Sequence, residues 1–183
     1  MKRLNLFSLA EAALDGFRPS QVAAAVEALS ATFCEGRHDF GYDSRLRQAA
    51  YAVHLLPTHI SDVTRLLCDL PLDWCHGAEV QVAALGAGPG SDVFAICDLL
   101  AREVDDGQLA DLQTVTLTRL DRVTHWDQTF ALLWPRWLEL LEQRSPGLLT
   151  AVDLVTPFPS VCWDAQQPDL SSAAREVLTQ ADL

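Results

Sequence analysis

The pattern of hydrophobic and polar positions changes character near residue 76. Before that point apolar residues recur every three or four positions, which is the spacing of amphipathic helices. This spacing predicts helices over residues 20–36, 43–56 and 61–70. We expect Pro57 and Pro71 to end the second and third of these helices, because proline disfavours helical backbone in the residue before it. The first 75 residues are therefore predicted to be all-helical.

Beyond residue 76, strand-like and helix-like segments alternate. Val80 to Leu85 is continuously apolar, and we expect it to form a strand that is buried on both faces. Further strands are predicted over residues 114–120 and 150–155, with helices over residues 92–104, 126–143 and 171–180. Pro135 is expected to kink or restart the second of these helices. Such alternation is typical of a parallel α/β sheet.

The predicted organisation is an α/β fold in two parts. Residues 1–76 form an all-helical N-terminal cap, and residues 77–183 form a half-domain with a Rossmann-like parallel sheet. With 183 residues, of which 49% are hydrophobic, the chain is long enough to bury one sizeable core.

The amino-acid composition limits which binding partners and which cellular compartment are expected. The chain has 25 acidic against 13 basic residues and no basic run, which disfavours nucleic acid as a partner. No stretch approaches the ~20 apolar residues of a membrane span. The five cysteines are scattered, and neither Cys34 with His38 nor Cys75 with His76 has the paired spacing of a zinc site. We therefore expect a cytoplasmic protein that binds no metal.

The segment LGAGPGSD, Leu85 to Asp92, places three glycines between a predicted strand and a predicted helix. Glycines at this place permit a tight turn and let a ligand lie against the backbone, beside the free N–H groups of the helix. A phosphate-binding P-loop is excluded, because Ser91 and Asp92 follow where a lysine is required. The dinucleotide motif fits poorly, since its third glycine is replaced by Ser91. A plain glycine-rich turn is the alternative.

The loop resembles the first motif, G-x-G-x-G, of class I S-adenosylmethionine-dependent methyltransferases. LDRVTHWDQTF, Leu120 to Phe130, and RQAAYAVHLLPTHISDVTRLL, Arg47 to Leu67, are similar to segments of a small group of methyltransferase-like proteins. The resemblance covers roughly residues 42 to 130. It implies a Rossmann-like fold and S-adenosylmethionine as the cofactor.

The resemblance also implies roles for individual residues. Asp121, at the end of the second strand, would hold the ribose hydroxyls, and the adenine would stack on Trp126. Asp92 would face the cofactor's ammonium group or simply cap the following helix. Tyr42 and Tyr51 would form a lid on the substrate side. The full cofactor-binding set is Gly86, Ala87, Gly88, Pro89, Gly90, Asp92, Asp121, Arg122 and Trp126.

The chain departs from the family in two respects. Asp121 follows Gly90 by 31 residues, whereas about 20 is usual for nucleotide-type sites. The family's sheet also continues beyond the third strand, so we expect an incomplete methyltransferase core. Its first strand would then be an apolar edge that a second copy, a partner chain or the helical N-terminal part covers.

Two functions follow from these expectations. The first is a methyltransferase, or the cofactor-binding portion of one, that acts on a protein or small-molecule acceptor; the catalytic residues are not assigned. The second is a non-catalytic interaction module that pairs with another subunit through the sheet edge.

Overall fold

The computed structural model describes residues 4–36, 41–75, 77–164 and 170–182. Along the chain, these residues form the helices and strands α1 (Leu6–Ala12), α2 (Pro19–Cys34), α3 (Arg45–His54), α4 (Leu56–Cys68), the 3₁₀ turn η1 (Leu72–Cys75), β1 (Glu79–Leu85), α5 (Ser91–Asp105), β2 (Thr114–Asp121), α6 (Trp126–Arg144), α7 (Leu148–Ala151), β3 (Asp153–Val155), β4 (Val161–Cys162) and α8 (Ser172–Gln180).

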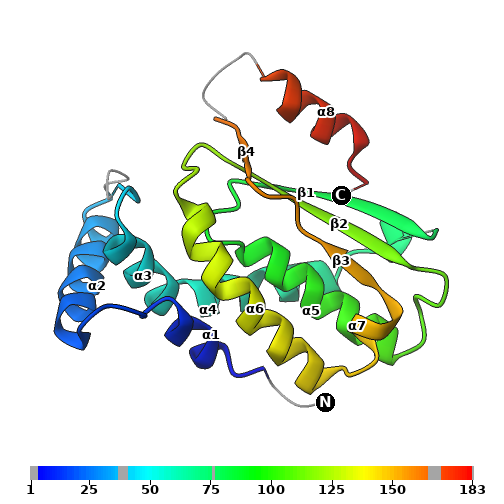
Figure 1. Cartoon of the computed structure of the whole chain (residues 1–183), viewed down its shortest axis with the longest axis horizontal. Helices are drawn as coiled ribbons and strands as arrows, with labels where there is room; N and C mark the ends of the chain where they lie inside the picture. The colour runs from blue at the N-terminus through cyan, green and yellow to red at the C-terminus, as the bar shows by residue number, and fades with distance from the viewer. Residues whose placement is uncertain (1–3, 37–40, 76, 165–169, 183) are drawn as a thin grey trace.

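The strands form one parallel sheet in the order β1, β2, β3, and β4 also pairs with β2. Val82 lies opposite Leu117 in the first pair, and Leu120 lies opposite Val161 in the last. Figure 1 shows α4, α5 and α6 on one side of the sheet and α8 on the other. The expected α/β fold, with a Rossmann-like parallel sheet after a helical N-terminal part, is confirmed.

The first strand is buried on one face only, so the expectation of two buried faces is wrong. Val80, Val82 and Ala84 are buried, whereas Glu79 and Leu85 are exposed. The cause lies outside the strand, because the main helical layer covers one side of the sheet, and of the helices in the described residues only α8 lies on the other side (Figure 1). A run that is apolar at five of six positions does not reveal how many helices cover it.

Two of the three prolines expected to end or kink helices, Pro57 and Pro135, lie within helices. Pro57 lies in the first turn of α4, where its missing N–H costs no hydrogen bond, so that helix begins at Leu56 rather than Ser61. Pro135 lies inside α6, which runs without a restart from Trp126 to Arg144.

The third predicted strand is shorter than expected. Residues 148–151 form α7, and β3 contains only Asp153–Val155. The sequence analysis did not predict β4, since two residues are too few to show an alternating pattern.

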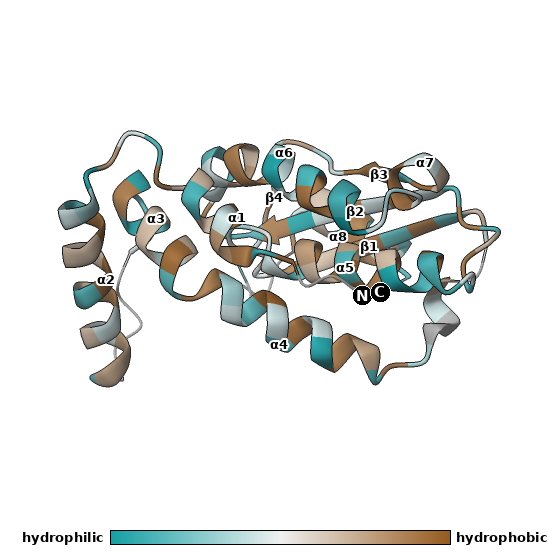
Figure 2. Ribbon diagram, turned by 90° about the horizontal axis from the view of Figure 1, so that it is seen from below, coloured by the Kyte–Doolittle hydropathy of each residue, from teal (hydrophilic) through white to brown (hydrophobic). Residues whose placement is uncertain are grey.

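The helical N-terminal part and the sheet share one hydrophobic core. Leu9 from α1, Ala52 from α3 and Ile60 from α4 belong to the same buried cluster as Val82 of β1 and Phe94 of α5. Figure 2 shows apolar and polar residues alternating along α4, which packs against α5. Among the described residues, no helix is long and apolar enough to cross a membrane.

Candidate functional site

The glycine loop, residues 86–90, lies across the carboxyl end of β2. The backbone N–H groups of Gly86 and Ala87 both donate to the carbonyl oxygen of Leu120, at 2.8 and 3.2 Å. Gly90 N–H donates to the carbonyl of Ala87 at 2.8 Å and closes a tight turn. The φ angles of Gly86, Gly88 and Gly90 are 64°, 51° and 100°, a region that favours glycine.

The three glycines face different surroundings. A Cβ atom on Gly90 would lie 2.7 Å from two ring carbons of Phe130, so packing excludes any side chain there. A Cβ on Gly86 would meet nothing within 4 Å, and one on Gly88 would lie 3.9 Å from the ring of Trp126. Gly90 therefore serves helix packing, whereas Gly86 and Gly88 leave backbone open to a ligand.

Asp121 connects the end of β2 directly to this loop. Its Oδ2 accepts a hydrogen bond from Gly88 N–H at 2.8 Å, and its Oδ1 accepts one from Val123 N–H at 2.7 Å. The residue is 9% exposed. A carboxylate has about four acceptor positions, so both oxygens retain capacity for ligand hydroxyls. Although 31 residues separate Asp121 from Gly90 in the sequence, the parallel pairing of β1 with β2 brings the carboxylate and the loop together.

Three aromatic side chains, which we name the aromatic cluster, lie beside Gly88. Trp126, the first residue of α6, is 3% exposed. The ring centroid of Tyr42 lies 4.9 Å from that of Trp126, and Tyr51 contacts the same indole edge-on at 5.4 Å. The two tyrosines thus cover Trp126 in this structure. Because Trp126 is almost fully buried, a planar ligand would stack on it only after a covering side chain has moved.

Acidic and histidine side chains surround this cluster. The Tyr51 hydroxyl lies 2.7 Å from Nδ1 of His59. Burial raises the pKa of Tyr51 above its usual range, and the nearby Tyr42, Asp92 and Asp121 add to the effect. Tyr51 therefore stays a neutral phenol at neutral pH.

Asp92 is the second residue of α5 and is partly buried. Burial raises its pKa, and the opposing effects of His59 and a Ser91 hydrogen bond are smaller. Asp92 does not cap the helix, since the N-cap residue is Gly90 and no side chain accepts a hydrogen bond there. The capping alternative is therefore wrong, because the N-cap position is occupied by the left-handed Gly90, two residues before Asp92.

Two polar residues that the sequence analysis missed support the aromatic cluster. Gln48 of α3, 1% exposed, donates through Nε2 to the carbonyl oxygen of Tyr42 at 2.7 Å. The Thr129 hydroxyl of α6 donates to Oε1 of Gln48 at 2.5 Å. This chain of hydrogen bonds joins α6 to the segment that carries Tyr42. Their signal in the sequence is a polar residue on the apolar face of a helix, which suggests a buried hydrogen bond but not its partner.

A buried ion pair that the sequence pattern did not indicate lies at the start of α6, next to Trp126. Arg119 of β2 donates through a terminal nitrogen to Asp127 Oδ1 at 2.7 Å, and its guanidinium lies 3.8 Å from the centroid of the Phe130 ring. Both oxygens of Asp127 accept from the backbone N–H of Ser160, at 3.2 and 3.0 Å. Burial lowers the pKa of Arg119, against the raising effect of Asp127. This pair fixes the start of α6 to the end of β2 and to the segment before β4.

The remaining residues predicted for the site are two residues of the glycine loop and one that follows Asp121. Ala87 and Pro89 are buried and contribute only backbone to the loop surface. Arg122 is exposed. His38 and His76, weighed above as metal ligands, lie outside the described residues. Within the described ranges, no three His, Cys, Asp or Glu side chains are grouped to hold a metal ion.

The side chains of the site are chemically suited to a cationic ligand that bears hydroxyl groups and a ring. Asp92 and Asp121 supply negative charge and acceptors, and aromatic faces attract cations. A phosphate group, by contrast, would be repelled by the same two carboxylates. No family model matches the chain, and no curated protein or solved structure matches it significantly. The assignment of a function therefore rests on the site itself.

Proposed function

We propose that this chain binds S-adenosylmethionine at the glycine loop and acts in the cytoplasm as a methyltransferase, or as the cofactor-binding portion of one. The main support is the hydrogen bond between Gly88 N–H and Asp121. It joins the loop after β1 to the acid at the end of β2, the place where open α/β sheets bind ligands. The proposed acceptor is a protein or a small molecule, in keeping with the formal net charge of -12.

The charge of the site favours this cofactor over a dinucleotide. S-adenosylmethionine carries a sulfonium and an ammonium group, and it has no phosphate. The carboxylates of Asp92 and Asp121 and the faces of the aromatic cluster are suited to both cations. Asp121 would hold the ribose hydroxyls, and the open backbone at Gly86 and Gly88 would face the amino-acid part.

The chain's own contribution to the reaction is positional. The cofactor, when bound, supplies an electrophilic methyl group on sulfur. The loop and Asp121 would fix the cofactor's orientation, and the partly buried tyrosines would exclude water from it. The Tyr51 hydroxyl keeps its proton and shares a hydrogen bond with Nδ1 of His59. Positioning alone contributes a large share of the rate of such displacements.

Calorimetric titration with S-adenosylmethionine and S-adenosylhomocysteine tests the proposal. We expect a dissociation constant of about 1–100 μM for the wild type, about 6–8 kcal/mol of binding free energy. Gly88→Val is expected to abolish binding, because the branched side chain would occupy the loop surface beside Trp126.

Gly107→Val is the matched control for this substitution. Gly107 also has a positive φ, 73°, and open surroundings, but it follows the far end of α5. It imposes a similar backbone strain without touching the loop, so it should leave the affinity unchanged. The absence of heat and of a thermal shift with both ligands on the folded wild type would refute the proposal.

The raised pKa of Asp92 makes a separate prediction about pH. The folded pKa lies above the ordinary value of 3.8, so the folded protein binds a proton more tightly than the unfolded chain. As pH falls from the folded pKa towards ~4, the wild type should gain stability relative to Asp92→Asn, and below that pH the difference should stay constant. Urea unfolding of both proteins between pH 7 and 4 measures this difference. If the difference in stability between the two proteins does not change with pH, the pKa of Asp92 is not raised in the folded protein.

A second candidate function is the interaction module, favoured by the outer edge of β1. Among the described strands, β1 lies at one end of the sheet. Gln81 N–H donates to Asp182 Oδ2 at 2.9 Å, and Asp182 N–H donates to the Gln81 carbonyl oxygen at 2.7 Å. At Gln81 the outward-facing backbone groups of β1 are thus already paired with Asp182, and we propose that a second copy of the chain pairs with this edge in its place. Sedimentation of the wild type and Asp182→Ala tests it, and two monomeric proteins would exclude it.

A further inference from the structure

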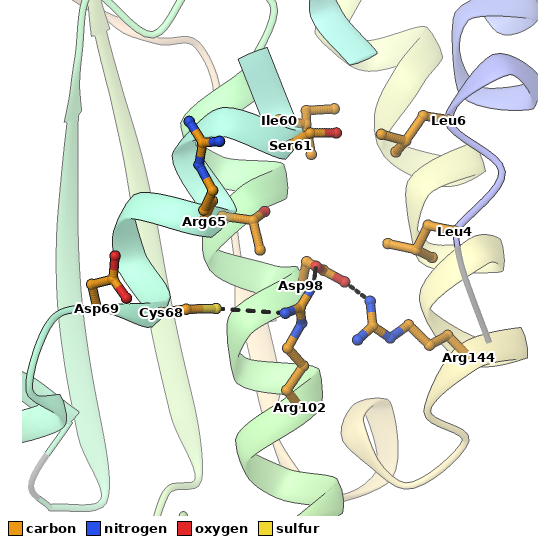
Figure 3. A pocket seen from close by; sticks show the side chains of 11 residues that line it. Leu4, Leu6, Ile60, Ser61, Arg65, Cys68, Asp69, Asp98, Arg102 and Arg144 are labelled. Atoms are coloured by element: carbon orange, nitrogen blue, oxygen red, sulfur yellow. Dashed lines mark hydrogen bonds and ion pairs between the residues drawn. The ribbon is translucent and has the colours of Figure 1, made fainter. Parts of the chain in front are cut away.

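A cavity lies away from the glycine loop, between the N-terminal segment, α4, α5 and the end of α6 (Figure 3). Its volume is about 540 Å³. This lies within the range of roughly 300–1,000 Å³ that is typical of small-molecule sites. Arg102, which lines it, lies about 16 Å along the α5 axis from Ser91, where the glycine loop ends.

The cavity has an apolar part and a charged part. Figure 3 shows Leu4 and Leu6 on one side and Ile60 above, while Arg102 and Arg144 meet around Asp98 below them. Each arginine donates to one oxygen of the Asp98 carboxylate. A ligand in this cavity would therefore lie with one end against aliphatic side chains and the other against guanidinium groups.

Buried polar atoms of Thr64 and Arg102 in the lining have no hydrogen-bond partner. The Thr64 side chain is on α4, the residue is 5% exposed, and its Oγ1 is unpartnered. Arg102 donates to Asp98 at 2.9 Å and to the Cys68 sulfur at 3.5 Å, but its Nε–H is buried without an acceptor. A buried donor left unpaired is destabilising, so a ligand acceptor that reaches the Arg102 Nε–H or the Thr64 hydroxyl would be stabilised here.

We propose that this cavity binds a carboxylate that carries an apolar tail. The carboxylate oxygens would accept from Arg102 Nε–H and the Thr64 hydroxyl, and the tail would lie along Leu4, Leu6 and Ile60. A phosphate ester is less suited, because its second negative charge would face the Asp98 carboxylate. This inference does not depend on cofactor binding at the glycine loop.

Titration of the full chain with octanoate, by calorimetry and by thermal unfolding, tests the inference. Octanoate is expected to bind and to raise the melting temperature in a saturable manner. Octanol lacks the charge and acetate lacks the tail, so each should bind at least tenfold more weakly. Octyl phosphate should also bind more weakly than octanoate.

Two substitutions locate the site. Arg102→Gln should weaken octanoate binding more than tenfold, and Thr64→Val, which keeps the shape of the side chain, about fivefold. Arg175→Gln and Thr179→Val, on exposed positions of α8, are the matched controls and should leave the affinity unchanged. Absence of binding, equal binding of octanol, tighter binding of octyl phosphate, or insensitivity to both cavity variants would each overturn the proposal.

Discussion

Gly90→Ala is expected to destabilise the protein by about 2–6 kcal/mol, although it adds a single methyl group. Two costs combine. The φ of 100° at Gly90 is strained for any residue with a Cβ, at about 1–3 kcal/mol. The added Cβ would also lie 2.7 Å from the Phe130 ring, and such overpacking costs about 1–3 kcal/mol more.

The Phe130 ring has little room to yield. It is stacked on Phe94 with ring centroids 5.7 Å apart and on Trp134 at 5.5 Å. On its other side lies the Arg119 guanidinium. The strain of Gly90→Ala must therefore be absorbed by the loop or by α5, which carry the proposed cofactor site.

Gly86→Ala is the matched control, measured in the same urea unfolding experiment. Its φ is 64° and a Cβ would meet nothing within 4 Å, so only the backbone strain of about 1–2 kcal/mol is expected. The difference between the two variants isolates the packing against Phe130. Equal losses of stability would contradict the proposed role of Gly90.

Asp127→Asn is expected to destabilise the protein by about 3–5 kcal/mol, since it leaves the Arg119 charge buried without a counter-ion. The Arg119 side chain is 1% exposed and that of Asp127 is 9% exposed. Asparagine has nearly the same shape and retains an acceptor for Ser160 N–H, so the loss reports the charge rather than a cavity. Urea unfolding followed by tryptophan fluorescence measures it.

Two further variants test the explanation. Glu139→Gln breaks the exposed pair with Arg136 and should cost less than about 1 kcal/mol. Replacing both partners, Arg119→Met with Asp127→Leu, should recover most of the stability lost in Asp127→Asn, because no buried charge remains. A double variant less stable than Asp127→Asn would show that the pair itself, and not its balance of charge, holds the structure.

Those parts of the site that depend on neighbouring residues in the sequence could be predicted from it. The run of apolar residues before Gly86 and the periodic residues after Ser91 predict a strand, a turn and a helix from neighbouring residues alone. The prediction that Val80 to Leu85 is buried on both faces was wrong, because coverage depends on helices far away in the chain. The cover of Tyr42 and Tyr51 over Trp126 was also beyond local pattern, since helices α3 and α6 are joined there by Gln48 and Thr129.

The sequence by itself determined the order of the longer helices and strands, the parallel α/β class and the position of the glycine loop. These features depend on the spacing of apolar residues and on glycine's access to positive φ, both of which act over a few residues. Only the tertiary structure decided that Asp121 bonds to Gly88, that Asp127 neutralises Arg119, and that Arg102 and Thr64 share a cavity. Each of these contacts joins residues brought together by strand pairing or helix packing, and the spacing of residues along a chain carries no record of that approach.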